Sequence, residues 1–330
     1  MGEFELIARY FDRPVQRAVL GVGDDCALLQ THVNTRLAVS TDMLVLGRHF
    51  FADVCPFKLG HKALAVNLSD LAACGARPLA FTLALSMPAA DEAWLEQFSR
   101  GLLALADAHG CELIGGDTTC GPLTICITIF GEIPVLAGRS LALLRSGAVD
   151  GDDLYVSGTV GDARLALDAL RGQVTLPAGV LEKARARLEM PTPRVALGLA
   201  LRGIASAAID ISDGLLGDLG HILSSSNVGA TVYVDVATSL IAARAEAMEL
   251  SDGQWRALAL SGGDDYELLF TAAPSRRQAV SDAAQASHTP VTRIGHIHAQ
   301  AGLQLIDCNG APQPNIYQSF DHFASGASER

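Results

Sequence analysis

Aspartate residues next to glycine or other small residues recur along this chain of 330 residues. Five segments have this character: VGDDCALL (22–29), STDM (40–43), NLSDLAACGA (67–76), IGGDTT (114–119) and DISDG (210–214). A sixth acidic segment, SGGDDYELLF (261–270), resembles them in composition. An ionised carboxylate removed from water needs a partner, and ligand sets made only of oxygen favour hard cations such as Mg²⁺. Any one Asp, taken singly, is more typical of a helix N-cap or a turn. Their recurrence predicts a site for divalent cations.

The common phosphate-binding and catalytic motifs are missing from the sequence. It contains no GxxxxGK[ST], no HRD or DFG, no HExxH and no GxSxG. The stretch GVGDDC begins like a dinucleotide fingerprint, but Cys26 stands where the third glycine is required. If the protein handles nucleotides, we expect an acidic, metal-dependent mode of binding.

Composition excludes several other classes of protein. The chain is 49% hydrophobic and only 18% charged, which is too apolar for a disordered chain. Its net charge of −12 argues against nucleic acid as the main partner, because phosphate contacts need clustered Lys and Arg. No stretch approaches the roughly 20 apolar residues of a membrane-spanning helix. The acidic N-terminus and seven cysteines without a CxxC pair lead us to expect a cytoplasmic protein.

The elements that must carry the acidic segments alternate between strand and helix patterns. In the first part we predict strands over 36–44, 79–87 and 123–133, and helices over 58–76 and 91–109. In the second part we predict a strand over 153–158 and a helix over 160–170, and helix and strand signals continue to alternate through 210–223, 230–236, 266–272 and 291–297. A segment rich in Gly and Asp, 137–153, is typical of a crossing between domains. The pattern predicts an α/β (α+β) fold of two domains, residues 1–138 and 139–330.

Taken together, the motifs resemble those of one family. VGDDCALL, STDM followed by HF, VNLSDLAACGARP, IGGDT, RSGA, VSGTVGD, DISDGL and SGGDDYELLFT occur in that order. This order is similar to that of the thiamine-monophosphate kinases, which are related to aminoimidazole ribonucleotide synthetase and selenophosphate synthetase. The resemblance implies a mixed-sheet N-terminal domain that binds metal and ATP and dimerises through its strands, followed by a C-terminal α/β domain. It also implies ATP-dependent phosphorylation of thiamine phosphate to thiamine diphosphate, with several Mg²⁺ ions.

The resemblance assigns roles to particular residues but names no covalent nucleophile or general base. The implied metal ligands are Asp25, Ser40, Thr41, Asp42, Asp70, Asp117, Asp210 and Asp213. The implied ATP contacts are Gly116, Asp117, Arg145 and Ser212. The implied contacts to thiamine phosphate are His49, Asp264 and Phe320. Many relatives have Glu at the position of Asp264, and Trp or Tyr at that of Phe320.

The residues and the resemblance leave two alternatives and one expectation about assembly. One alternative is another ATP-dependent synthetase of the same superfamily. Selenophosphate synthetase is disfavoured within that group, because the sequence shows no matching reactive Cys or Lys in an N-terminal glycine-rich loop. The other is a relative that binds nucleotide or metal without catalysis. We also expect a homodimer, because the strands over 36–44, 79–87 and 123–133 leave sheet faces and edges that one small domain cannot cover.

Overall fold

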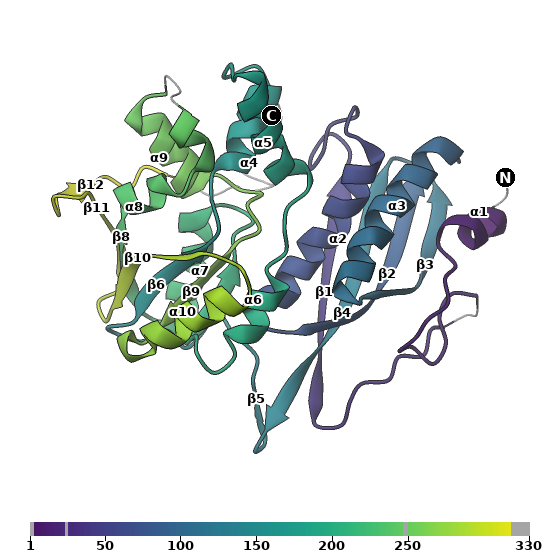
Figure 1. Cartoon of the computed structure of the whole chain (residues 1–330), viewed down its shortest axis with the longest axis horizontal. Coiled ribbons are helices and arrows are strands. Elements are labelled where there is room, and N and C mark those ends of the chain that lie inside the picture. Colours follow the sequence, from purple (N-terminus) through teal and green to yellow (C-terminus); the bar gives the residue numbers. More distant parts are fainter. Residues whose placement is uncertain (1–2, 24–25, 247–249, 318–330) are drawn as a thin grey trace. The chain divides into compact units, whose positions relative to one another are not determined.

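The structure is a computed structural model that describes residues 3–23, 26–246 and 250–317 (Figure 1). The chain divides into two compact units, Met1–Ala142 and Leu143–Arg330. We expected the division after residue 138. The short strand β5 (Arg139–Ser140) pairs with the preceding strand and so keeps residues 139–140 with the first unit.

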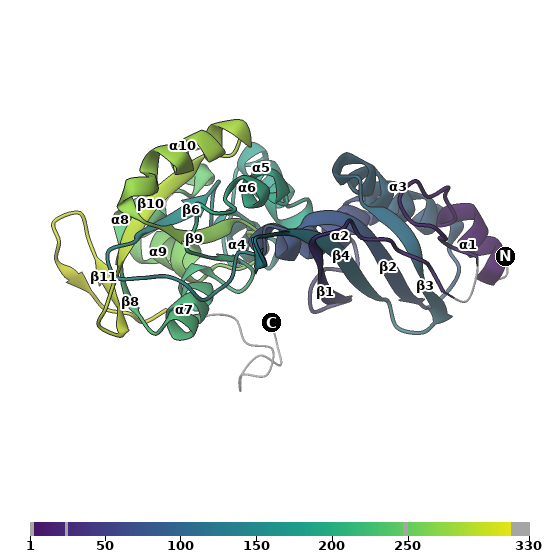
Figure 2. The same cartoon turned by 90° about the horizontal axis from the view of Figure 1, so that it is seen from below.

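The first unit is a mixed sheet with helices on one face. Its elements are α1 (Glu3–Tyr10), β1 (Thr35–Val45), α2 (Pro56–Ala73), β2 (Arg77–Met87), α3 (Glu92–His109), β3 (Glu112–Cys120), β4 (Thr124–Leu136) and β5. The strand order is β1-β4-β2-β3, in which only β2 and β3 run parallel. Figure 2 shows α2 and α3 side by side against this sheet.

Two glycines let α2 and α3 cross with their backbones almost in contact. A Cβ atom on Gly60 would lie 2.1 Å from the carbonyl oxygen of Phe98, and one on Gly101 would lie 1.8 Å from that of Phe57. No larger side chain fits at either position without separating the helices. Helix α3 is capped at its N-terminus by Asp91, whose side chain accepts the amide hydrogens of residues 93 and 94. This packing fixes α2, which carries the NLSD motif, against the sheet.

The second unit is also built on a mixed sheet. Its strands are β6 (Asp153–Ser157), β7 (Ala207–Asp210), β8 (Gly229–Tyr233), β9 (Leu268–Ala272), β10 (Val291–His298), β11 (Gly302–Ile306) and β12 (Pro312–Gln313), in the order β12-β11-β8-β10-β6-β9-β7. Its helices are α4 (Asp162–Leu170), α5 (Ala178–Glu189), α6 (Val195–Ala200), α7 (Leu215–Ser226), α8 (Val234–Ser239), α9 (Asp252–Ser261) and α10 (Arg277–Ala286). Aliphatic side chains from β6, β7, β8 and α7 form one continuous core.

The predicted α+β fold is confirmed, and the differences lie in individual elements. Strand β3 was missed, because the glycines and the Asp of IGGDTT are typical of a turn rather than a strand. In the segment 230–236, where helix and strand signals alternate, β8 ends at Tyr233 and α8 begins at Val234. No helix of the described residues is long and apolar enough to cross a membrane.

Candidate functional site

The STD motif lies on β1, with its side chains on alternate faces of the sheet. Ser40 and Asp42 are half-buried, whereas Thr41 between them is exposed. The hydroxyl of Thr41 is 2.9 Å from that of Thr128 on β4. Because side chains alternate along a strand, Ser40 and Asp42 share the face of the sheet that α2 covers.

A hydrogen bond joins the STD motif to the NLSD motif. The hydroxyl of Ser40 donates to Oδ2 of Asp70, which is half-buried near the end of α2. The residues before Asp70 on this helix are mostly buried. A carboxylate at this place is partly removed from water and needs polar partners. The structure therefore brings together two of the acidic segments that the sequence analysis singled out.

The IGGDT motif is at the same level of the sheet but on a distant strand. Asp42 pairs with Ile127 on β4, Ile127 with Leu83 on β2, and Leu83 with Gly116 on β3. Three strand spacings separate β1 from β3, which is about 14 Å. The exposed Asp117 follows Gly116 on β3. One ion cannot bind both Asp42 and Asp117 at this separation, so these carboxylates would serve different ions.

Glycine is required at position 116 by the neighbouring strand. Gly116 has φ +150°, and a Cβ atom there would lie 1.9 Å from the carbonyl oxygen of Leu83. No side chain fits in that space. The second glycine of IGGDT therefore allows β3 to pair closely with β2 just before Asp117.

His49 closes a turn after β1. Its ring atom Nδ1 accepts the amide hydrogen of Val45 at 3.0 Å, and its own amide donates to the Val45 carbonyl at 3.0 Å. A ring that accepts at Nδ1 carries its proton at Nε2 when neutral. The local structure accounts for the position of this histidine, and its contact with substrate stays a prediction.

In the second unit, the DISDG motif forms the turn between β7 and α7. Asp210 is the last residue of β7 and is 7% exposed, while Ser212 and Asp213 in the turn are half-buried. The turn ends at Gly214, which has φ +115°. A Cβ on this glycine would lie 2.9 Å from the carbonyl of Ser261. The backbone at Ser261 therefore packs closely against the turn.

A buried carboxylate that the sequence analysis missed holds this turn in place. Oδ2 of Asp218, in the first part of α7, accepts the amide hydrogens of Ser212 at 3.0 Å and of Asp213 at 3.1 Å. Burial raises the pKa of Asp218 to about 7, although these hydrogen bonds oppose the shift. An acid in the first turn of a helix that follows a glycine-rich turn is the sequence signal for such a bond.

The charge of Arg145 acts on this same carboxyl group. Arg145 is exposed, and its carbonyl accepts the hydroxyl hydrogen of Ser226 at 3.2 Å. Its positive charge is among the influences that lower the pKa of Asp218. Arg145 therefore belongs to the surroundings of the DISDG turn.

The sixth acidic segment pairs with the DISDG turn through the main chain. The amide of Asp264 donates to the carbonyl of Ser212 at 2.9 Å, and the amide of Tyr266 donates to that of Ile211 at 2.8 Å. The amide of Ile211 in turn donates to the carbonyl of Glu267 at 2.8 Å. These bonds extend the pairing of β7 with β9 and bring an implied ATP contact, Ser212, next to an implied substrate contact, Asp264.

Two of the three acids in the sixth segment are structural. Asp265 is 1% exposed, and both its oxygens accept the amide hydrogen of Gly161 at 2.9 Å. Burial raises the pKa of Asp265 well above its ordinary value. Glu267 is fully buried. Asp264 is half-buried, which leaves it as the acid of this segment that a ligand can reach.

Glu267 is held by two arginines that the sequence analysis did not single out. Arg194 donates from Nε and Nη2 to the two carboxylate oxygens, at 2.6 Å each, and Arg187 donates at 2.7 Å. Ser157 adds a bond from its hydroxyl at 2.6 Å. A glutamate inside the apolar run YELLF was a signal that a buried partner must exist.

Two of the predicted residues, Asp25 and Phe320, lie outside the described residues. Within the described part, no group of three or more His, Cys, Asp or Glu side chains is placed to hold a metal ion. The available donors are carboxylate and hydroxyl oxygens, which suit Mg²⁺. This ion commonly binds to one or two carboxylates and completes its shell with water and substrate phosphates. The residues therefore fit Mg²⁺ that arrives with a nucleotide better than a resident ion in an all-protein cage.

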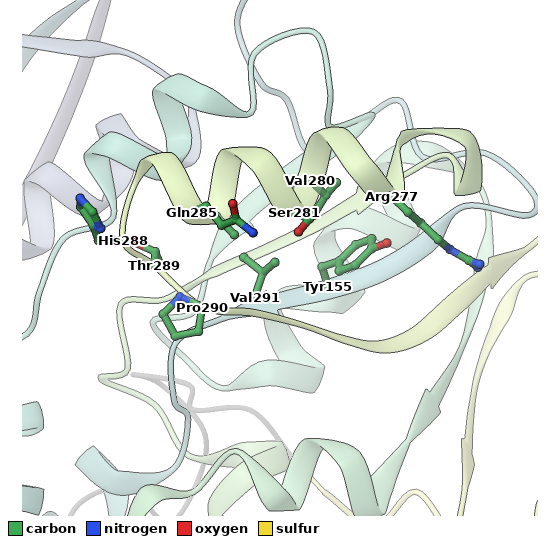
Figure 3. Close-up of a pocket in the computed structure, with 10 residues that line it drawn as sticks. Tyr155, Arg277, Val280, Ser281, Gln285, His288, Thr289, Pro290 and Val291 are labelled. Atoms are coloured by element: carbon green, nitrogen blue, oxygen red, sulfur yellow. The ribbon is translucent and has the colours of Figure 1, made fainter.

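A pocket of about 580 Å³ in the second unit contains none of the predicted residues. Figure 3 shows it between α10 and the strands β6 and β10, with Arg277, Ser281 and Gln285 on the helix side and Tyr155 and Val291 on the strands. Arg277 already forms two hydrogen bonds with the buried carboxylate of Asp153, at 2.6 and 2.9 Å. The pocket is therefore separate from the acidic segments.

The chain matches known families and proteins over most of its length. Residues 23–133 match the N-terminal domain of AIR synthase related proteins, and residues 149–308 match the C-terminal domain. A thiamine-monophosphate kinase of Salmonella typhimurium is 49% identical over 98% of this chain and 99% of its own.

Solved structures of such enzymes share the fold. The crystal structure of thiamine-monophosphate kinase from Stenotrophomonas maltophilia K279a has a TM-score of 0.82 and 46% identity, over 94% of this chain and 96% of that one. The structure of AaThiL complexed with AMPPCP and TMP has a TM-score of 0.73 and 27% identity, over 89% of each chain.

The support that Asp218 gives to the DISDG turn predicts a change in hydrogen exchange. In Asp218→Ala, the amides of Ser212 and Asp213 should exchange at least about tenfold faster, because they lose their acceptor. Hydrogen–deuterium exchange with mass spectrometry measures this. Asp162→Ala is the matched control, since the buried carboxylate of Asp162 accepts the amides of Ala242 and Ala243 at 3.0 and 2.9 Å. The Asp162→Ala control should leave exchange in the DISDG turn unchanged. Equal exchange in the turn of both variants would contradict the supporting role of Asp218.

Proposed function

The chain belongs to the thiamine-monophosphate kinase family of AIR synthase related proteins, and we propose that it transfers the γ-phosphoryl group of ATP directly to thiamine monophosphate, giving thiamine diphosphate. The observation that carries this proposal is the 49% identity with such an enzyme over 98% of the chain. The main-chain pairing of Ser212 with Asp264 supports it, because it joins an implied nucleotide contact to an implied substrate contact.

The reaction needs charge neutralisation more than it needs a base. The attacking group is an oxygen of a phosphate monoester, whose second pKa is about 6, so it is largely dianionic at neutral pH. Two unit charges at 4 Å repel by about 4 kcal/mol at an effective dielectric constant near 20, and ATP adds several charges. A site with many carboxylates and no evident catalytic base fits this requirement only if cations accompany the substrates.

Magnesium ions, when bound, would supply this neutralisation and help to align the phosphates for in-line attack. The proposed ligands in the first unit are Ser40, Thr41, Asp42, Asp70 and Asp117, together with Asp25, which lies outside the described residues. Ser40 and Thr41 would bind partly through backbone oxygens, since the Thr41 side chain lies on the other face of the sheet. Those in the second unit are Asp210 and Asp213. The distance between β1 and β3 supports more than one ion in the first unit.

The other proposed contacts follow the chemistry of the two substrates. Gly116, Asp117, Arg145 and Ser212 would contact ATP, where a guanidinium such as that of Arg145 pairs well with phosphate oxygens. His49 and Asp264 would contact thiamine monophosphate, and the carboxylate of Asp264 offers a charge partner for its cationic thiazolium ring. Phe320 would add an aromatic face for the same cation.

We also propose a homodimer formed through β1, on the face of the sheet that α2 does not cover. This strand is at the edge of its sheet, and Leu37, Val39 and Met43 alternate along it with exposed fractions of 49%, 55% and 54%. An apolar edge strand that stays exposed invites pairing with another chain. A second copy of the same strand is the simplest symmetric cover for it.

We propose a cytoplasmic location because none of the seven cysteines forms a disulfide bond within the described residues. Cysteines that remain as thiols are typical of a reducing compartment.

The proposed function is tested by incubating the protein with ATP and Mg²⁺ and with thiamine monophosphate, thiamine or buffer as acceptor, while ADP and thiamine diphosphate are measured. We expect equimolar ADP and thiamine diphosphate with thiamine monophosphate only. ADP release that does not depend on thiamine monophosphate would favour another synthetase of the superfamily, and nucleotide binding without turnover would favour a non-catalytic relative.

Asp70 provides a test of the metal role. Asp70→Asn keeps the shape and removes the charge, so the variant should fold while its turnover falls about 100-fold or more, and added Mg²⁺ should restore little of it. Steady-state kinetics over a range of Mg²⁺ concentrations measures this. Asp107→Asn, which changes an exposed carboxylate on α3, serves as control. Near-normal turnover of Asp70→Asn at ordinary Mg²⁺ would show that Asp70 is not a metal ligand.

The dimer is tested by introducing a charge on β1, on the face of the sheet that α2 does not cover. Val39→Lys should shift the mass measured by light scattering from dimer to monomer, because a buried lysine ammonium in the interface is costly. Val149→Lys, at a position that is 56% exposed in the second unit, should leave the mass unchanged. A wild-type monomer at micromolar concentration would contradict the proposal directly.

A further inference from the structure

The segment that carries Asp264 has an unusual backbone. Asp264 has φ +66° and Tyr266 has φ +50°, so two residues with side chains adopt the left-handed conformation that favours glycine. Such a conformation costs free energy and persists only where the surroundings enforce it. Here the amides of both residues donate to the DISDG turn, at 2.9 Å to Ser212 and at 2.8 Å to Ile211.

The two buried acids of the segment anchor it from the opposite side. Asp265 and Glu267 are buried, and they bind the amide of Gly161 and the guanidinium groups of Arg187 and Arg194. Asp264 and Tyr266 are half-buried. The segment therefore directs alternate side chains into the unit and toward the ligand-accessible side.

On the accessible side, the two side chains meet. The hydroxyl of Tyr266 is 3.1 Å from Oδ1 of Asp264 and donates to it. The backbone fixes where the Asp264 side chain starts, but a carboxylate turns easily about its terminal bond. The tyrosine hydroxyl limits this rotation by holding one of the two oxygens.

We propose that Tyr266 is a positioning residue that orients the carboxylate of Asp264 toward the cationic ring of thiamine monophosphate. This inference rests on the proposed function, in which Asp264 contacts that substrate. A carboxylate held in its binding orientation loses less conformational freedom when the cation binds, so affinity rises. Because Tyr266 acts through Asp264, its effect should concern thiamine monophosphate and not ATP.

Tyr266→Phe removes only the hydroxyl and is the first test. We expect the KM for thiamine monophosphate to rise about three- to tenfold, with kcat and the KM for ATP changed by less than about twofold. The melting temperature should stay close to that of the wild type. If both KM values rise and the melting temperature falls, Tyr266 is only structural and the proposal is overturned. Unchanged kinetics in Tyr266→Phe would overturn it as well.

The chain offers a closely matched control. Tyr155 donates to Oδ2 of Asp153, two residues before it, at 3.3 Å, so its geometry resembles that of the Tyr266–Asp264 pair. Tyr155 lines the pocket of Figure 3, and Asp153 is also bound by Arg277 and Arg293. Tyr155→Phe should leave both KM values unchanged.

A double-mutant cycle decides whether Tyr266 acts through Asp264. In an Asp264→Ala background, Tyr266→Phe should produce no further rise in the KM for thiamine monophosphate. An undiminished rise would mean that Tyr266 contacts the substrate itself, which overturns a positioning role. The wild type is measured in parallel. If it forms no thiamine diphosphate, the proposed function has failed, whereas an active wild type with an unaffected Tyr266→Phe variant rejects this inference alone.

Discussion

The cost of withdrawing a carboxylate from water organises the second unit of this protein. Glu267 is fully buried, and two guanidinium groups and a hydroxyl bind it. Asp265 and Asp218, which are 1% and 3% exposed, each accept backbone amide hydrogens instead. Since a buried polar or charged group without a partner is strongly unfavourable, these partners cannot be exchanged freely for water. The two turns that they hold are those that carry Asp210, Ser212, Asp213 and Asp264.

The acids therefore divide into those that build the turns and those that remain available to ligands. In SGGDDYE the division follows position along the segment, because Asp265 and Glu267 are buried while Asp264, which precedes them, lies on the accessible side. In DISDG the supporting acid lies outside the motif, at Asp218 on α7. A preorganised turn suits phosphoryl transfer, in which the protein contributes chiefly position and electrostatics.

The first unit solves a different problem, which is to present carboxylates at separated places on one sheet. The register places Asp42 and Gly116 at one level but on strands three spacings apart. Asp70 comes close to β1 because α2 lies across the sheet, and α2 is held there by its close contact with α3 at Gly60 and Gly101. This arrangement suits a highly charged substrate pair accompanied by several cations better than one compact ion site.

The sequence by itself determined the fold class, most of the strands and helices of the first unit, and the segments that matter. It could do so because hydrophobic periodicity and the local chemistry of Gly and Asp are properties of short stretches of chain. It did not reveal β3, whose glycines are typical of a turn, nor the supporting roles of Asp218, Arg187, Arg194 and Tyr266. Those roles depend on which side chains meet, such as Arg194 with Glu267, which is 73 residues away. Only the tertiary structure decides such pairings, because burial and partner, rather than residue type, determine whether an acid supports the fold or stays available to a ligand.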